Sequence, residues 1–254
     1  MQLTTDTLTA ADGTRIALHR MGPGEGQGRP VLMLHGLFSS AEMNWVKFGH
    51  AALLADNGFE CLMPDWRVHG ESDAPNDPAL YSPGVLMRDA LQIVEVLGLD
   101  DYDLVGFSLG ARTAASAVIV GLRPRRLVLG GMGIEGLSNW ETRSAFFVDM
   151  IDRFDSIERG DPAFLAKSFM KGQGIDPVAA RLLLTQGVED IAMDDLAKIT
   201  MPTLVLIGDE DRDNGSPEKL RDALPDAEMA IIPGNHMGSV TKKDMGRAIL
   251  EFLS

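Results

Sequence analysis

Short apolar runs alternate with longer amphipathic segments along the chain, and this alternation constrains the fold more than any other feature. The runs with the character of buried strands are residues 31–35, 60–64, 103–107, 126–131, 203–208 and 227–232. The segments with the pattern of helices are residues 41–57, 83–97, 109–121, 217–224 and 241–253. Continuous apolar strands that alternate with helices predict an α/β fold, with a mostly parallel sheet covered by helices on both faces.

The start of the chain predicts an antiparallel addition to that sheet. Residues 14–20 follow Asp12-Gly13, a dipeptide typical of hairpin turns. The glycine-rich stretch from Gly22 to Gly28 has the composition of a loop between two strands. We therefore expect the first two strands to run antiparallel to each other.

One segment interrupts the alternation. Residues 133–200 contain no convincing strand, only three or four helix-like pieces. Five of the ten phenylalanines of the chain lie there: Phe146, Phe147, Phe154, Phe164 and Phe169. They can form the core of the insertion, line a substrate pocket, or do both. We predict a helical cap at residues 133–200, inserted into a core domain of residues 1–132 and 201–254.

Charge and composition restrict the class of partner. The 254 residues carry a formal net charge of −14, and the one short basic stretch, residues 123–126, is too short to offset it. Such a field repels nucleic acid and anionic membrane surfaces, so we expect neither as a partner. A neutral small molecule fits better as the substrate.

The remaining composition indicates a cytoplasmic protein. The first thirty residues lack the basic start and apolar core of a signal peptide, and no run approaches the ~18 apolar residues of a membrane span. The one cysteine, Cys61, lies in an apolar run, and we predict that it is a small buried core residue.

A serine stands between two glycines where the strand 103–107 should become a helix. Gly106-x-Ser108-x-Gly110 would be a weak signal alone, because a tight turn can contain serine by chance. In this context the glycines let the backbone turn sharply and leave the Ser108 hydroxyl exposed at a helix N-terminus. With these residues the chain resembles the α/β-hydrolase superfamily, and the resemblance extends over essentially the whole length. The superfamily's fold is the one that the alternation predicts, with a small helical cap.

The resemblance implies an oxyanion hole, which is a pair of N–H donors that stabilise the charge developing on an attacked carbonyl oxygen. His35-Gly36 follows a predicted strand and matches the His-Gly turn of the family. By position, the donors would be the backbone N–H groups of Leu37 and Leu109. His35 itself is expected to be a structural hydrogen-bonding residue.

The resemblance also implies an acid and a base, in the chain order serine, acid, histidine. His236 is the histidine that lies downstream of the strands 203–208 and 227–232, in a loop before the last helix. Serine is a poor nucleophile at neutral pH, so His236 would take its proton and a buried carboxylate would orient the ring. The family pattern places the acid at the third residue after Gly208, which is Asp211, with Asp209 and Asp213 as alternatives.

A third match covers residues 65–72, DWRVHGES, where many family members have Asp-x-Arg-Gly-x-Gly-x-Ser. Asp65 and Arg67 should be tied into the hydrogen bonds of a loop. Val68 replaces the usual glycine, so we expect no positive φ there. A catalytic role for His69 is not expected.

These features together predict a serine hydrolase that cleaves small to medium, mostly uncharged carboxylic esters through an acyl-enzyme. The serine argues against the family's dehalogenases and epoxide hydrolases, which use aspartate at this position. Thioester, lactone or C–C bond hydrolysis, perhydrolysis and acyl transfer remain open, as does a binding protein with little turnover.

No metal-ligand spacing and no dinucleotide fingerprint occur, so neither a metal nor a cofactor is expected. We expect the substrate pocket to draw on apolar side chains near the turn after the first parallel strand and on the cap. These candidates are Phe38, Trp140, Phe146, Phe147, Met150 and Phe154.

Overall fold

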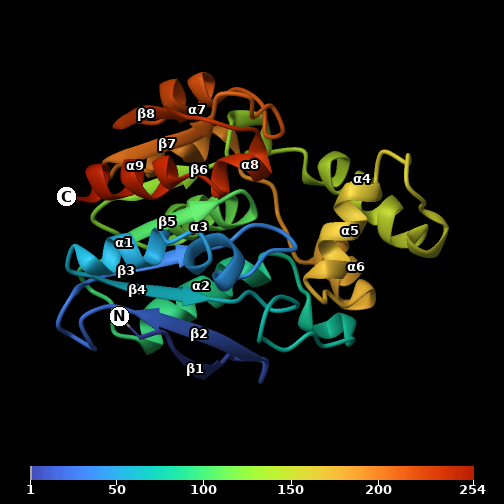
Figure 1. Ribbon diagram of the computed structural model, residues 1–254, viewed down its shortest axis with the longest axis horizontal. Coiled ribbons are helices and arrows are strands. Elements are labelled where there is room, and N and C mark those ends of the chain that lie inside the picture. The colour runs from blue at the N-terminus through green and yellow to red at the C-terminus, as the bar shows by residue number, and fades with distance from the viewer. Residues whose placement is uncertain (1) are drawn as a thin grey trace.

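An eight-stranded sheet crosses the computed structural model, which describes residues 2–254 (Figure 1). The strand order is β1-β2-β4-β3-β5-β6-β7-β8. The strands are β1 Thr4–Thr9, β2 Arg15–Met21, β3 Arg29–Leu34, β4 Phe59–Pro64, β5 Asp103–Phe107, β6 Leu127–Gly130, β7 Thr203–Gly208 and β8 Ala227–Ile232. All six predicted parallel strands are present, and their ends differ from the prediction by two residues at most.

The sheet is antiparallel only at its beginning, as predicted. β1 pairs with β2, and β2 with β4, in antiparallel register, whereas every later pairing is parallel. The carboxyl ends of the parallel strands therefore meet at one edge of the sheet, where the loops that follow β3, β5, β7 and β8 come together.

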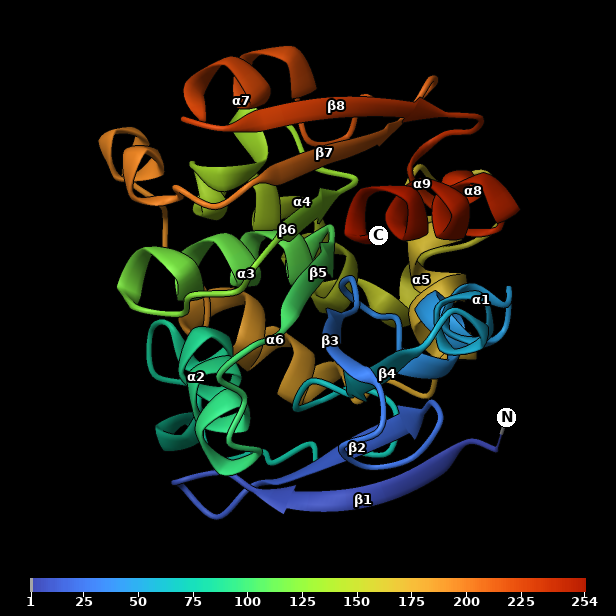
Figure 2. The same ribbon diagram turned by 90° about the vertical axis from the view of Figure 1, so that its left-hand side faces the viewer.

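Helices cover both faces of the sheet (Figure 2). α1 His50–Asp56 packs against α9 Lys243–Leu253 on one face, and α2 Val85–Val96 packs against α3 Leu109–Val120 on the other. α7 Pro217–Ala223 packs on β7 and β8. None of the helices in residues 2–254 has the length and hydrophobicity that crossing a lipid bilayer requires.

The chain between residues 133 and 200 forms the helices α4 Trp140–Asp152, α5 Phe164–Gly172 and α6 Pro177–Gln186, with short 3₁₀ helices before α4, between α4 and α5, and after α6. No strand of the sheet comes from this segment; its only β-bridge, in the part of the chain that is described, joins Arg159 and Asp161. The three helices lie together at one end of the molecule (Figure 1).

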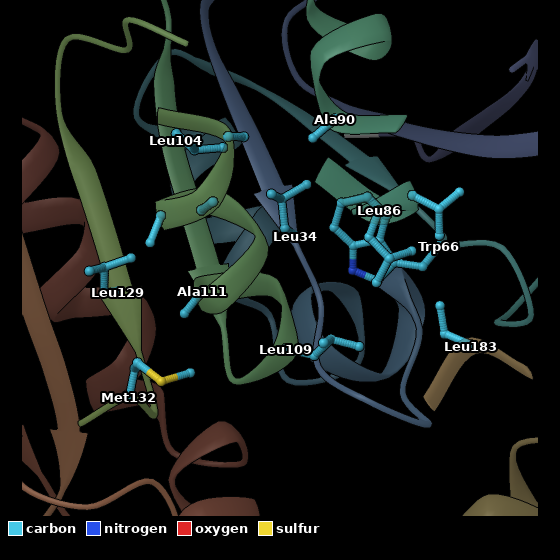
Figure 3. Packing of buried hydrophobic residues seen from close by; sticks show 14 of the residues in the cluster. Leu34, Trp66, Leu86, Ala90, Leu104, Leu109, Ala111, Leu129, Met132 and Leu183 are labelled. Atoms are coloured by element: carbon cyan, nitrogen blue, oxygen red, sulfur yellow. The ribbon is translucent and has the colours of Figure 1, made fainter. Parts of the chain in front are cut away.

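The cap helices share a hydrophobic core with the sheet. One continuous buried cluster runs from the α2 and α3 face of the sheet to α6. Figure 3 shows Leu183 of α6 on the side of this cluster where Trp66 and Leu86 lie, and Leu109 at the start of α3. The first turn of α3 is thus held between the sheet and the cap.

The predicted helix at residues 41–57 is two helices. A five-residue π-helix, Glu42–Val46, comes first, and α1 begins only at His50. Gly49 between them has φ 81°, a left-handed conformation that glycine adopts without a Cβ clash and that interrupts the helical path.

The lone cysteine lies where the sequence predicts. Cys61 is fully buried on β4, and burial raises the pKa of its thiol to about 12. Its Sγ lies 3.5 Å from the carbonyl oxygen of Ala51. A thiol with so high a pKa is an inert core group.

Candidate active site

Ser108 lies at the sharp turn between β5 and α3. Its φ of 54° and ψ of −115° are strained for a residue with a Cβ. A Cβ added to Gly106 would collide with the backbone of Gly110, and a Cβ added to Gly110 would collide with the carbonyl group of Leu34. The two glycines are therefore required for this turn, and the turn presents the serine hydroxyl beyond the carboxyl edge of the sheet.

His236 connects Ser108 to an acid. Its Nε2 lies 3.0 Å from Ser108 Oγ, and its Nδ1 lies 2.8 Å from Asp211 Oδ2. His236 is the first residue of a short helix, α8 His236–Val240, rather than a loop residue as expected, and Asn235 caps this helix by accepting the Gly238 N–H at 2.8 Å. This hydrogen bond from the N-cap residue holds in place the backbone that carries the His236 imidazole.

Asp211 is buried and ionised. Burial alone would raise the pKa of Asp211, but the hydrogen bond and charge of His236, together with the backbone N–H of Asp213, bring it below its ordinary value. An ionised carboxylate only accepts hydrogen bonds, so Nδ1 of His236 donates to it and Nε2 is left to accept the Ser108 proton. The sequence prediction that these three side chains meet agrees with their placement.

Neither of the two alternative acids is hydrogen-bonded to the His236 ring. Asp209 accepts the Gly234 N–H at 2.8 Å. Asp213 is exposed, and one of its oxygens lies within 4.8 Å of ligand atoms of Asp211 and His236. These three side chains are the only group in residues 2–254 with the spacing of metal ligands. However, Asp211 Oδ2 and His236 Nδ1 are already hydrogen-bonded to each other, which a metal ion would have to displace.

The turn after β3 lies beside Ser108. A Cβ on Gly36 would approach the Ser108 Cβ to 3.3 Å. The Gly36 N–H donates to Asn44 Oδ1 at 3.1 Å, and the Phe38 N–H donates to His69 Nε2 at 3.0 Å. Between them, the N–H of Leu37 has no acceptor in the described chain, nor does the N–H of Leu109. Leu37 and Leu109 line the same cavity as Ser108, so these unpaired N–H groups are candidate donors of an oxyanion hole.

Two neutral histidines support this turn. His35 Nε2 accepts the Trp66 N–H at 3.0 Å, so its Nδ1 donates to the Gly36 carbonyl oxygen at 2.8 Å. His69 accepts from Phe38 and donates to the Arg67 carbonyl oxygen at 2.9 Å. Complete burial lowers the pKa of His35, and lowers that of His69 to about 3. Neither histidine contacts Ser108, which agrees with the structural role expected of both.

The loop at residues 65–72 is tied down as predicted. Asp65 accepts hydrogen bonds from the N–H groups of Ala41 and Glu71 at 2.7 and 2.9 Å. Arg67 is buried and pairs with Asp89 through two hydrogen bonds of 2.8 and 2.7 Å. These bonds join the loop to the π-helix and to α2.

The expectation for Val68 was wrong. Its φ is 79°, in the left-handed region, although valine is β-branched and disfavours this conformation. Its N–H donates to the Asp73 carbonyl oxygen at 2.8 Å, and the bonds of its neighbours Arg67 and His69 fix the chain on both sides. The left-handed backbone is thus adopted without a glycine, because the surrounding hydrogen bonds determine the turn.

A cavity of about 100 Å³ opens at Ser108. Of the predicted pocket residues, Trp140 and Phe147 line it, as do Leu37 and Leu109. The further lining residues include Arg112, Met132, Gly136, Arg143, Asp213 and Asn214, besides Ser108 and His236.

The other predicted pocket residues do not line this cavity. Phe38 is buried, also with a positive φ, and packs edge-to-face on Phe147 with 5.6 Å between the ring centroids. Phe146 is 45% exposed on the outer side of α4, Met150 is fully buried, and Phe154 packs under the Lys167 ammonium. None of these four side chains is among the residues that line the cavity at Ser108.

Sequence reasoning missed the polar side of the cavity. Arg112 lies one helical turn after Ser108 on α3, a spacing that brings two side chains to the same face, so this residue had a readable signal. Arg143 and Asn214 had none, since only the packing of α4 over the loop after β7 brings them together.

The fold and the arrangement around Ser108 correspond to a known family. The sequence profile of the alpha/beta hydrolase fold matches residues 29–156. The chain belongs to the alpha/beta hydrolase family. This alpha/beta hydrolase superposes on a hydrolase from Pseudomonas aeruginosa PA01 with a TM-score of 0.77, at 22% identity and with 99% and 98% of the two chains covered.

Individual relatives differ in their activities. The chain is 26% identical to the non-heme chloroperoxidase CPO-A1 of Kitasatospora aureofaciens, over 90% of its own length and 94% of that protein's. It is 36% identical to epoxide hydrolase 2 of Siraitia grosvenorii, over 35% of its own length and only 27% of that relative's. This and four further curated relatives are matched over 25–38% of their own lengths. The family is therefore shown, and the reaction has to be argued from the site.

Proposed function

We propose that this alpha/beta hydrolase cleaves small carboxylic esters through an acyl-enzyme formed on Ser108. The observation that carries the proposal is the position of the His236 ring between the two other side chains. Its Nε2 lies 3.0 Å from Ser108 Oγ, and its Nδ1 lies 2.8 Å from Asp211 Oδ2. A hydroxyl bonded to the accepting nitrogen of an imidazole, itself held by a carboxylate, is an activated nucleophile.

The steps follow from the geometry. Ser108 Oγ attacks the ester carbonyl carbon while its proton passes to His236 Nε2. The carbonyl oxygen becomes an anion, and the N–H groups of Leu37 and Leu109 stabilise it. The imidazolium, stabilised by Asp211, then protonates the leaving alcohol oxygen as the C–O bond breaks. Water repeats the sequence on the acyl-enzyme, which releases the acid and restores Ser108.

The size of the cavity favours small substrates. The open cavity beside Ser108 has a volume of about 100 Å³, and Trp140 and Phe147 form part of its wall. Such a space admits a short acyl or alcohol group. Epoxide hydrolysis, named in some relatives, is not proposed, because the turn carries a serine hydroxyl where those enzymes need a carboxylate nucleophile.

The test is covalent labelling with a fluorophosphonate together with turnover of p-nitrophenyl acetate, butyrate and octanoate. We expect one label per chain, on Ser108, and multiple turnovers that fall with acyl length. The Ser108→Ala variant is the matched control and should neither label nor turn over. A panel of thioesters, lactones and epoxides then ranks the related bonds.

Two results would contradict the proposal. Labelling without multiple turnover on any ester would favour a binding protein that keeps a reactive serine. Turnover of an epoxide above that of every ester would assign the site to another reaction, and the name of the epoxide hydrolase relatives would then be the better guide.

A further inference from the structure

Two arginines line the small cavity that holds Ser108 and His236. Arg112 comes from α3 and Arg143 from α4. We propose that the pocket selects esters that carry a carboxylate besides the scissile bond, and that Arg143 recognises this carboxylate. The inference deepens the proposed function and rests on it. It departs from the uncharged substrate that the net charge of −14 favours, because a local cation outweighs a distant field at contact range.

The charge of Arg143 has no direct counter-ion. Its Nη2 donates to the carbonyl oxygen of Asp213 at 3.0 Å and to the side-chain oxygen of Asn214, and both acceptors are neutral. No carboxylate oxygen in the described chain lies within 4.0 Å of its guanidinium, and its Nε and Nη1 have no acceptor there. The side chain is half-buried, and this burial lowers its pKa, whereas the charges of Asp213 and Glu135, which lie beyond contact distance, raise it.

These two carboxylates compensate the charge of Arg143 only at a distance, and a half-buried cation gains more from a carboxylate in direct contact. The planar guanidinium presents donors that match the two oxygens of a carboxylate. The two hydrogen bonds that Nη2 donates hold the guanidinium in place between α4 and the loop after β7. Arg143 is therefore preorganised to receive an anionic group inside the cavity.

Arg112 differs from Arg143 and serves as an internal comparison. It is fully buried, and its guanidinium donates to the carbonyl oxygens of Gly136 and Glu189 and to Asp190 Oδ1, at 2.6 to 2.7 Å. The contact with Asp190 compensates its charge. Its Nε is buried without an acceptor in residues 2–254.

One acid also lines the cavity. Asp213 is exposed to water, which screens its charge, whereas Arg143 is half-buried. The Asp213 carboxylate should weaken the binding of an anionic substrate without abolishing it. Removing this charge with Asp213→Asn should thus raise the preference for anionic esters, opposite to the effect of removing Arg143.

The experiment compares the monomethyl with the dimethyl esters of succinic, glutaric and adipic acid. Each pair shares the scissile bond and differs in one charge, and methanol release measures kcat/KM. We expect the wild-type protein to prefer the monoester about tenfold or more at one of the three lengths. Arg143→Gln should lower kcat/KM for that monoester about 10- to 100-fold and change the diester less than about threefold. Arg247→Gln, which removes an exposed charge on α9, is the matched control and should change neither.

A second measurement covers esters that bind but turn over slowly. The same monoesters should inhibit p-nitrophenyl acetate hydrolysis competitively, at lower concentrations than the diesters, and Arg143→Gln should remove that difference. Arg143→Lys keeps the positive charge but lacks the planar guanidinium. This variant should recover part of the difference in inhibition between monoesters and diesters. These inhibition constants need only a readout from the neutral ester.

The proposal is overturned if the wild-type protein processes and binds the diester as well as the monoester at all three lengths. It is also overturned if Arg143→Gln lowers the rates on both esters equally, since the arginine would then only hold α4 in place. Failure of the proposed function looks different, because p-nitrophenyl acetate itself would then not be turned over.

Discussion

Asp211 and His236 share a hydrogen bond of 2.8 Å between Oδ2 and Nδ1, and this bond decides which nitrogen of the ring faces Ser108. Because the environment lowers the pKa of Asp211, the carboxylate stays an acceptor at neutral pH. The neutral ring then carries its proton on Nδ1, and Nε2 accepts from Ser108 Oγ. The acid therefore sets the tautomer that the proposed reaction needs.

Replacing the acid should be far more harmful than replacing its neighbours. Asp211→Asn keeps the shape but offers an amide to Nδ1, which stabilises the wrong tautomer and should lower kcat by up to ~10⁴. Asp209→Asn, which alters only the contact with the Gly234 N–H, and Asp213→Asn should each lower it far less. Steady-state rates of all three variants on p-nitrophenyl acetate check the assignment. A mild Asp211→Asn beside a severe neighbour would show that another carboxylate orients the ring.

Ser108→Ala should abolish turnover without unfolding the protein. The change removes one oxygen, and alanine keeps the Cβ that the strained turn already accommodates. A residual acceleration of roughly 10³–10⁴ over water can persist from the oxyanion donors and binding. Rates should be measured beside a thermal melt, which is expected to match the wild type. Near-normal ester hydrolysis by this variant would rule out Ser108 as the nucleophile.

Adjacent phenylalanines on α4 should behave differently. Phe147 lines the cavity, so Phe147→Ala should enlarge it and shift the preferred p-nitrophenyl ester to longer acyl chains. Phe146 is 45% exposed, and Phe146→Ala should leave the chain-length profile unchanged. The profile from acetate to decanoate measures both. Equal shifts in the two variants would mean that α4 moves as a unit and that the contact of Phe147 with the cavity is not what sets the length.

The positions of the candidate triad could be predicted because each member follows a strand. Buried strands are continuous apolar runs, and the carboxyl ends of parallel strands meet at one edge, so Ser108 after β5 and Asp211 after β7 had to approach each other. The short spacing from β8 to His236 brought the base to the same edge. Local sequence placed these three residues after strands of the same sheet, and the resemblance to the family supplied their roles and the choice of Asp211.

The pocket could not be predicted in the same way. Consecutive residues on a helix point roughly 100° apart, so which of Phe146 and Phe147 faces the cavity depends on how α4 docks, and no local pattern records that. Val68 fails for a related reason. The preference of valine against positive φ is a local tendency, and hydrogen bonds from residues distant in the sequence override it.

Acid should destabilise the fold through its buried histidines. Above pH ~6.5 His69 is neutral in both the folded and the unfolded chain, so it adds no pH dependence. Below that pH the unfolded chain takes up a proton that the folded His69, with a pKa of about 3, does not. Stability should therefore fall as the pH drops from ~6.5 towards 3, by up to about 1.4 kcal/mol per pH unit for this group.

Urea unfolding at pH 7, 6 and 5 measures this loss. His69→Gln lacks the titrating group and should lose less stability over the same range. His19→Gln is the control, because His19 should change the stability of the protein with pH in the opposite direction to His69. The hydrogen bond to Asp65 raises the pKa of His19, so its contribution is fully present below its unfolded pKa and is lost as the pH rises through the folded value. His19→Gln should therefore lose stability more steeply than the wild type as the pH falls. Parallel curves for all three proteins would show that other groups control the acid sensitivity.

At position 68, the glycine variant should be more stable than the alanine variant, which is the reverse of the usual order. Val68→Ala loses buried apolar area but keeps a Cβ at φ 79°, whereas Val68→Gly loses slightly more area and removes the strain. A left-handed residue with a Cβ costs roughly 1–2 kcal/mol, so we expect the glycine variant to be about 1 kcal/mol more stable than the alanine variant in urea unfolding. At Val178, exposed on α6, the same pair should show the ordinary order, with glycine less stable by about 1 kcal/mol. If alanine is the more stable replacement at both positions, the left-handed conformation of Val68 carries no strain, and its side-chain packing alone determines what this loop tolerates.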